Sequence, residues 1–115
     1  MIDAAAIGEI IAIYEKHAWT LRRVLLSDSL RKSLSTKGAE IFKDAQVIAS
    51  EMNAAWFSRS SRPDSTAWEI RHLSETPFAL VEVIDDSTDS KRSEEVFAIT
   101  EAKMRAMVLK RPQAN

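Results

Sequence analysis

Apolar side chains recur at helical spacing near both ends of the chain. Residues 3–18 carry them at steps of three and four, and Asp3 precedes this stripe as an N-cap. A second stripe of the same spacing follows Asp89 or Ser90, either of which can cap a helix that Pro112 stops. The pattern therefore predicts one helix at each end. The buried stripe of the second helix comprises Val96, Phe97, Thr100, Met104, Met107 and Val108.

After the first helix, the pattern changes to that of a strand. Residues 19–27 are rich in β-branched, aromatic and aliphatic side chains, which favour extended backbone. Ser27 or Asp28 can then cap a short helix, and Gly38 lies where such a helix would end. The sequence therefore predicts a strand followed by a short helix.

The next segment, residues 39–52, fits two structures. Its apolar side chains have helical spacing, and its Ala, Glu, Lys and Met residues favour helix. Residues 46–50 also fit a short edge strand, because they include two β-branched side chains. We favour the helix.

Three further apolar segments, at residues 54–61, 66–73 and 78–84, predict strands. A turn signal with Pro at its second position separates the first two, at residues 62–65. Another turn signal, at residues 74–77, separates the last two. Short loops join antiparallel neighbours, so these segments predict an antiparallel meander.

Together, these elements predict an α+β fold in a single domain that spans residues 1–115. The expected architecture is an antiparallel sheet of about four strands, with the helices packed on one face. A chain of this length buries enough apolar surface to fold without disulfides.

The composition narrows the possible chemistry. The chain has no Cys, which excludes disulfides, a thiol nucleophile and a Cys-based zinc site. Its two glycines, Gly8 and Gly38, stand 30 residues apart. Phosphate-binding loops need several glycines within a short stretch, so nucleotide-binding folds of that kind are also excluded. We therefore expect no cofactor and no metal.

The charge and the N-terminal residues give expectations about location and partners. The net charge of −1 gives no general attraction to nucleic acid or to an acidic membrane. Met1-Ile2-Asp3 lacks the positive leader of a signal peptide, and no early stretch is long enough to span a bilayer. We expect a cytoplasmic protein that does not bind membranes.

The turns also predict a strand register and the two faces of the meander. Four-residue loops at residues 62–65 and 74–77 set Ser61 against Thr66 and Leu73 against Phe78. One face then carries Phe57, Trp68, Ile70, His72, Ala79, Val81 and Val83, which is an apolar core set. The other face is mixed and carries Trp56, Ser58, Glu69, Arg71, Leu73, Phe78, Leu80, Glu82 and Ile84.

Three functions compete for this mixed face, which is too apolar for ordinary solvent exposure. In the first, it binds a protein partner or a second copy of the chain. Aromatic residues and Arg are enriched at interfaces, and two-fold homodimers are the commonest soluble oligomers. The predicted contact residues are Trp56, Arg71, Phe78 and Leu80.

In the second hypothesis, the mixed face lines a small-molecule or catalytic cleft. The predicted register sets Glu69 against Glu82, and like charges so close raise one carboxyl pKa, as paired catalytic carboxylates require. An ordinary salt-bridge cluster, in which Arg22 or Arg23 bridges the two carboxylates, explains the pair more simply. We therefore do not favour an enzyme, and we assign no catalytic residue.

In the third hypothesis, the protein binds single-stranded nucleic acid, with aromatic rings for stacking and basic side chains for phosphates. The basic residues Arg59, Arg62, Arg71 and His72 interleave with Trp56, Phe57 and Trp68. The net charge of −1 argues against this function. The sequence thus favours a non-catalytic binding domain that self-associates, most simply as a homodimer, and it identifies no ligand.

Overall fold

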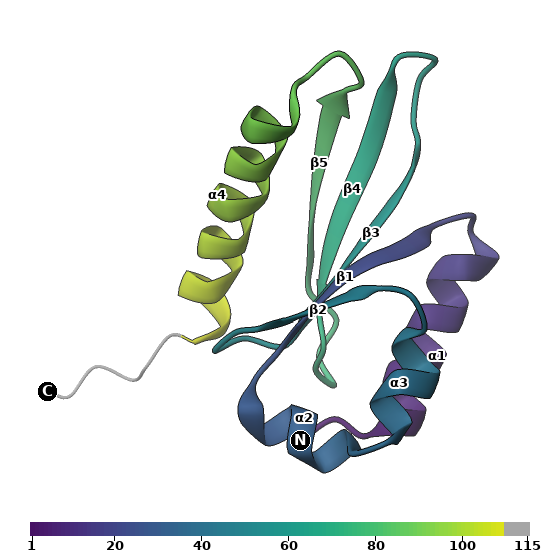
Figure 1. The fold of residues 1–115 in the computed structure, drawn as a ribbon, viewed down its shortest axis with the longest axis vertical. Coiled ribbons are helices and arrows are strands. Elements are labelled where there is room, and N and C mark those ends of the chain that lie inside the picture. The colour runs from purple at the N-terminus through teal and green to yellow at the C-terminus, as the bar shows by residue number, and fades with distance from the viewer. Residues whose placement is uncertain (110–115) are drawn as a thin grey trace, which may run out of the picture.

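The fold of residues 1–109 is described by a computed structural model, and Pro112, the predicted helix stop, lies outside these residues. The α+β class is confirmed, with a mostly antiparallel sheet that has five strands in the order β2-β1-β3-β4-β5 (Figure 1). The elements are α1 (Ala4–Lys16), β1 (Thr20–Leu26), α2 (Asp28–Leu34), α3 (Lys37–Phe42), β2 (Gln46–Ala49), β3 (Ala54–Ser60), β4 (Ser65–His72), β5 (Ala79–Asp85) and α4 (Ser90–Val108).

The fifth strand is β2, and it corrects the helix predicted over residues 39–52. The helix α3 ends at Phe42, because Lys43 adopts a left-handed backbone with φ of 48°. Beyond it, β2 pairs in parallel with β1 and sets Ile48 beside Leu25. Burial of Ile48 against the sheet outweighs the helical propensity of this segment, so the edge-strand alternative is the correct one.

The end of the first short helix also differs from the prediction. The helix α2 ends at Leu34 and not near Gly38, because Ser35 takes the left-handed conformation, with φ of 52°. Gly38 lies instead within the first turn of α3. The glycine is therefore not the C-terminal stop that its residue type suggested.

Three helices begin at the predicted capping side chains. Asp3 accepts a hydrogen bond from the Ala6 N–H at 2.9 Å, and Asp89 accepts one from the Arg92 N–H at 2.8 Å. In α2 the cap is Ser27, whose Oγ accepts from the Leu30 N–H at 3.2 Å. Each cap satisfies a backbone donor that the helix itself leaves free, and each contributes about 1 kcal/mol.

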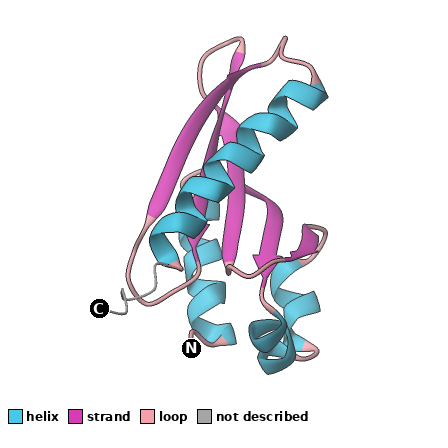
Figure 2. Ribbon diagram, turned by 90° about the vertical axis from the view of Figure 1, so that its left-hand side faces the viewer, coloured by secondary structure: helices cyan, strands magenta, loops and turns pink. Residues whose placement is uncertain are grey.

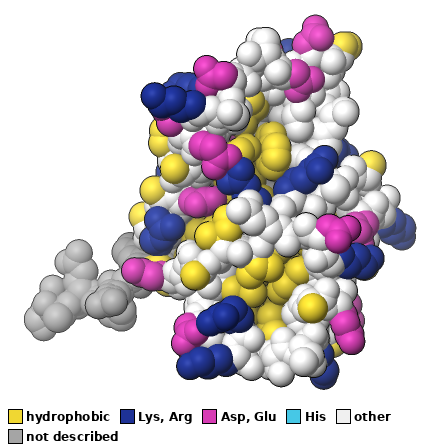
Figure 3. Space-filling view, in the orientation of Figure 1, with side chains coloured by type: hydrophobic (Ala, Val, Ile, Leu, Met, Phe, Trp, Pro, Cys, Tyr) yellow, Lys and Arg dark blue, Asp and Glu magenta, His cyan; other side chains and the backbone are white. Residues whose placement is uncertain are grey.

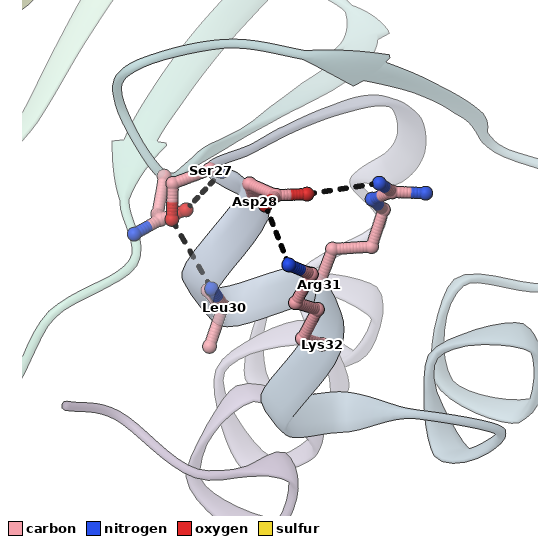
Figure 4. A network of polar contacts seen from close by, with 6 residues as sticks. Ser27, Asp28, Leu30, Arg31 and Lys32 are labelled. Atoms are coloured by element: carbon pink, nitrogen blue, oxygen red, sulfur yellow. Dashed lines mark hydrogen bonds and ion pairs between the residues drawn. The ribbon is translucent and has the colours of Figure 1, made fainter.

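The N-terminus of α2 is also tied to the sheet. Figure 4 shows Ser27 at the centre of this network, where its backbone N–H donates to the Asn53 side chain at 2.7 Å. On the outer side, Asp28 pairs with Arg31 at 3.0 Å and with Lys32 at 3.1 Å. These exposed ion pairs add little to stability, so the cap and the Asn53 bond fix the helix.

Helices cover both faces of the sheet, whereas the sequence predicted helices on one face only. On one side, α1, α2 and α3 enclose a core that includes Ile7, Ile11, Val24, Leu30, Leu34, Phe42 and Phe57. On the other side, α4 crosses the strands (Figure 2) and encloses a second core that includes Leu25, Met52, Trp56, Ile70, Phe97 and Met104. Trp56 and Phe57 are neighbours in β3 and point to opposite faces, so each ring needs its own cover.

The strand register differs from the predicted one by a single residue in both hairpins. Ser61 and Ser65 close the first loop through a 3.0 Å hydrogen bond, which leaves three residues between them where four were expected. In the second hairpin, the His72 N–H donates to Phe78 at 2.8 Å, and Leu73 turns away to bond Asn53 at 2.8 Å. Leu73 is buried there, so its burial lengthens this loop by one residue.

This shift exchanges the faces of β4 relative to its two neighbours, because side chains alternate along a strand. Trp56 now lies beside Ile70, and Ile70 beside Leu80. The covered face, under α4, holds Trp56, Ser58, Trp68, Ile70, His72, Leu80, Glu82 and Ile84. The open face, which is the opposite face of β4 and β5, holds Ala67, Glu69, Arg71, Ala79, Val81 and Val83.

Candidate binding face

The open face presents apolar side chains that no described helix covers. Val81 and Val83 lie on it, and each is more than half exposed, at 54% and 53%. The helix α1 packs beside β1 and the end of the sheet away from β5, so its cover stops at β4. The result is an apolar strip along β5, with the half-buried charges Glu69 and Arg71 on the neighbouring strand.

The strand that carries this strip is also an edge of the sheet. β5 spans seven residues and pairs only with β4, in a register without a bulge. It contains neither Lys nor Pro, the residues that commonly prevent an edge strand from pairing with another chain. The opposite edge, β2, is only four residues long. The two edges therefore differ in their capacity to accept another strand.

A hollow of about 450 Å³ lies between the open face and the C-terminal half of α1. Its lining includes Ile13, Tyr14, His17, Trp19, Arg59 and Glu69. The Tyr14 ring stacks on Phe57 with centroids 4.0 Å apart, and its hydroxyl donates a hydrogen bond to Glu69. These contacts fix Glu69 at the border of the open face.

Arg59 closes the other side of this hollow. Its guanidinium lies over the Trp19 ring, 4.6 Å from the centroid, and donates to the His17 carbonyl at 3.1 Å. The stacked pair covers the turn between α1 and β1, where Ala18 has a left-handed backbone with φ of 68°. Arg59 is exposed to solvent, but these two contacts hold its guanidinium against the fold.

The electrostatics of the hollow keep Tyr14 neutral. Burial raises the pKa of the Tyr14 hydroxyl above its ordinary value of 10.0, and the hydrogen bond to Glu69 raises it further. The nearby Arg71 acts in the opposite direction and has a smaller effect. The phenol therefore stays protonated well above neutral pH and donates its hydrogen bond to Glu69.

Of the four predicted contact residues, only Arg71 lies on the open face. Trp56 is fully buried under α4, and its indole N–H donates to Glu101 at 2.7 Å. Phe78 and Leu80 pack against the same core. The predicted stack of Trp56 and Arg71 is therefore wrong, because the register shift separates the two side chains onto opposite faces.

The predicted carboxylate pair is not formed. Glu69 lies beside Val81 on the open face, whereas Glu82 lies beside Trp68 on the covered face. Glu82 accepts a hydrogen bond from Thr100 in α4 at 3.4 Å. Two carboxylates on opposite faces of a sheet cannot share a proton, so the geometry removes the basis of the catalytic hypothesis.

Neither arginine bridges these carboxylates. The Arg22 Nε donates to the Ser58 hydroxyl at 2.8 Å, and Arg23 pairs with Glu94 of α4. The guanidinium of Arg23 also lies over the Phe97 ring, 4.8 Å from its centroid. Both side chains hold elements of the fold together.

The surface predicted to stack nucleic-acid bases is also missing. Trp56 and Phe57 are both fully buried, and they belong to the two separate cores. His72 lies at the end of the covered face, where burial lowers its pKa and the charge of Arg71 lowers it further. Rings that other protein side chains enclose cannot stack on bases.

The sequence alone did not identify the residues that surround the open face, namely Ile13, Tyr14, Trp19, Val81 and Val83. Alternation along β5 had already grouped the two valines with Ala79, and their predicted placement on the face of Phe57 is correct, but the wrong register joined them to Trp68, Ile70 and His72 of β4. The Tyr14 to Glu69 contact joins positions 55 residues apart, and no local pattern indicates it. The one sequence signal for the open face is the period of two along β5, which sets Ala79, Val81 and Val83 on one side of the strand.

A second apolar area lies between α2, α3 and β2. Figure 3 shows it as yellow side chains in the lower half of the molecule, with dark-blue Lys and Arg side chains around them. It is a hollow of about 260 Å³, with Leu34, Phe42 and Val47 among its lining residues and Arg31 and Lys43 at its border. Val47 is 47% exposed, so this area supplies a matched control for the valines of β5.

Comparisons with known proteins identify no relative: no family description matches the chain, and neither a curated protein nor a solved structure matches it. Within residues 1–109, no helix is long and apolar enough to cross a membrane. The same residues contain no group of three or more His, Cys, Asp or Glu side chains placed to hold a metal ion.

Proposed function

We propose that this protein is a non-catalytic interaction domain that self-associates through β5 and the open face. One observation carries the proposal: Val81 and Val83, each more than half exposed, point from the same side of an edge strand. Exposed apolar strips on unprotected edges are typical of surfaces that another polypeptide covers.

The composition of the open face supports binding to protein. Its apolar side chains lie along β5, and Glu69 and Arg71 lie beside them on β4. An apolar centre with a polar border is the usual arrangement of a protein interface, where Arg is enriched. Arg71 thus keeps the binding role expected from the sequence, but in the company of Val81 and Val83 and not of Trp56.

Sedimentation equilibrium of the purified chain at micromolar concentrations tests this function. We expect dimers for the original sequence, and monomers for Val81→Glu and Val83→Glu, because an added charge opposes burial of the strip. Val47→Glu is the matched control, since it places the same charge at a similarly exposed valine on the other edge strand. It should leave the dimer intact.

The same measurement can overturn the proposal in two ways. A clean monomer of the original sequence would exclude self-association. Dissociation by Val47→Glu alone would move the interface to the area between α2 and α3. Circular dichroism and urea unfolding of each variant would confirm that the fold is retained, because Val81 and Val83 are too exposed to support a core.

A further inference from the structure

We propose that two copies of this chain join edge to edge, with β5 antiparallel to β5 and Val81 on the two-fold axis. The two sheets, of five strands each, then form one continuous sheet. This inference rests on the proposed self-association and specifies its geometry. It distinguishes backbone pairing at the edge from stacking of one open face on another.

The hydrogen bonds of β5 show which of its backbone groups are available for such pairing. The Phe78 carbonyl and the Asp86 N–H both bond toward β4, at 2.8 Å each. Because bonding direction alternates along an antiparallel strand, the intervening even-numbered residues also bond toward β4. The N–H and C=O groups of Ala79, Val81 and Val83 therefore point to the free edge.

The same three residues carry the apolar side chains of the open face. Backbone pairing through Ala79, Val81 and Val83 would thus also bring together the exposed strips of the two copies. In a register centred on Val81, Val81 faces its own counterpart, and Ala79 faces the second copy's Val83. Each hydrogen-bonded pair then places two apolar side chains together on the open face. Pairing of this kind gives two backbone hydrogen bonds for each pair, or about six in all.

Charge disfavours the register centred one residue further along. A two-fold axis at Glu82 would set this carboxylate directly against the second copy's Glu82, with Cβ atoms about 5 Å apart. Glu82 is half-buried beneath α4, where screening by water is reduced. Centring on Val81 instead sets Glu82 against the second copy's Leu80.

Two other registers lose hydrogen bonds. A register centred on Val83 pairs Val81 with the second copy's Asp85, whose carbonyl already accepts from the Thr88 N–H at 3.0 Å. A register centred on Leu80 pairs Val83 with the second copy's Pro77, which has no N–H to donate. The register centred on Val81 avoids both losses.

Cysteine cross-linking tests this register, because the chain contains no Cys of its own. We expect Val81→Cys to form a disulfide-linked dimer rapidly under mild oxidation, several-fold faster than Ala79→Cys, Val83→Cys or the control Val47→Cys. A mixture of Ala79→Cys and Val83→Cys should form the mixed dimer in preference to either homodimer. Efficient cross-linking of Val81→Cys with Val83→Cys would instead establish the register centred on Glu82 and overturn ours.

Amide hydrogen exchange of the unmodified chain gives a second, independent measurement. On dimerisation, the amides of Ala79, Val81 and Val83 should exchange at least ten-fold more slowly, whereas those of Leu80 and Glu82 are already bonded to β4 and should change little. A dimer that leaves the Ala79, Val81 and Val83 amides unprotected would overturn edge pairing but leave the proposed function standing. A monomer in sedimentation would remove both.

Discussion

The two faces of the sheet at β4 and β5 both combine apolar and charged side chains, but their surroundings are opposite. The covered face presents Trp56, Trp68 and Ile70 to α4, with charged groups at the border of this core. The open face presents Val81 and Val83 to solvent, also with charged groups beside them. The difference lies in what the charged groups bind.

On the covered face, charged side chains bind partners in α4. Arg23 pairs with Glu94, and Glu101 accepts the indole N–H of Trp56. These bonds fix the helix over the strands. On the open face, Glu69 is held by Tyr14 of α1, and Arg71 donates to the neighbouring His72 carbonyl. Arg71 forms no ion pair within the described residues, so it remains available to a partner. One face therefore stabilises the fold, and the other is suited to association.

The largest expected effect is that of truncating the centre of the covered face. Trp56→Ala should destabilise the fold by about 3 to 5 kcal/mol, because the ring is fully buried and contacts Phe97 at 5.1 Å between centroids. Urea unfolding followed by circular dichroism measures this loss. In the remaining folded protein, association should be unchanged.

Trp68→Ala provides the comparison within the same core. Trp68 is only half-buried, although it also contacts Phe97, at 4.6 Å between centroids. Its loss should therefore be clearly smaller. A Trp56 variant of native stability that fails to associate would show that Trp56 belongs to an interface, as the sequence alone had suggested.

These two tryptophans also show how far sequence patterns reach. Periodicity and capping residues predicted α1, the start of α4 and the three strands of the meander to within two residues, because these signals are local. The faces were not predicted, because they depend on whether a loop has three residues or four. The position of Leu73 decided one loop, and its burial is a tertiary effect that no turn signal contains.

Met107 illustrates the same limit in α4. It belongs to the predicted stripe of the helix, together with Thr100 and Met104, yet it is 62% exposed, whereas the other two are buried. The next residue, Val108, packs against the core, whereas Met107 lines an open hollow beside Pro77 and Phe78 and stays exposed there. Helical periodicity gives the direction of a side chain but not the extent of its partner surface.

A smaller effect is expected at the junction of α1 and the open face. Tyr14→Phe removes the hydroxyl that donates to Glu69 and keeps the ring stacked on Phe57. We expect a loss of about 1 to 2 kcal/mol, since a hydrogen bond to a charged, half-buried acceptor is lost. Urea unfolding at neutral pH measures it.

The pH dependence gives the same contact a distinct signature. Because the pKa of Tyr14 is raised above 10.0 in the folded state, the unfolded chain loses the phenolic proton first as pH rises. Stability from this group is therefore complete below pH 10 and declines above it, and Tyr14→Phe should lack this decline. As the chain has only one Tyr, absorbance of the tyrosinate reports the titration directly. An absorbance rise centred near pH 10 in the folded protein would contradict the contact, whereas such a rise is expected in urea.

A further, smaller effect should appear where α4 meets β1. The hydrogen bonds from Arg23 hold the pKa of the Glu94 carboxyl below its ordinary value of 4.5. The unfolded chain therefore binds a proton first as pH falls, and the stabilisation is present above pH 4.5 and lost below it. Glu94→Gln should cost about 0.5 kcal/mol at pH 7, because the carboxylate is mostly exposed, and this cost should shrink as the pH falls below 4.5. A difference that persists at low pH would show that the pair acts through packing and not through charge. The exposed pair of Arg92 and Glu95, tested as Glu95→Gln, is the control within the same helix.

The smallest effect on folding, and the most informative for function, is expected at Arg71. Its cross-strand neighbours on the open face are Ala55 and Ala79, so the guanidinium has space to reach toward the β5 edge. A second copy paired along that edge would bring its exposed Asp85 to the same face, where opposite charges attract.

Arg71→Ala should therefore cost less than about 0.5 kcal/mol of folding stability and still weaken the dimer several-fold in sedimentation. Arg71→Lys, which keeps the charge and loses the planar donor group, should recover part of the affinity at low salt and less at high salt. If Arg71→Ala instead lowered stability and left association unchanged, the residue would belong with Arg23 as a support of the fold, and the functional difference between the two faces would rest on Val81 and Val83 alone.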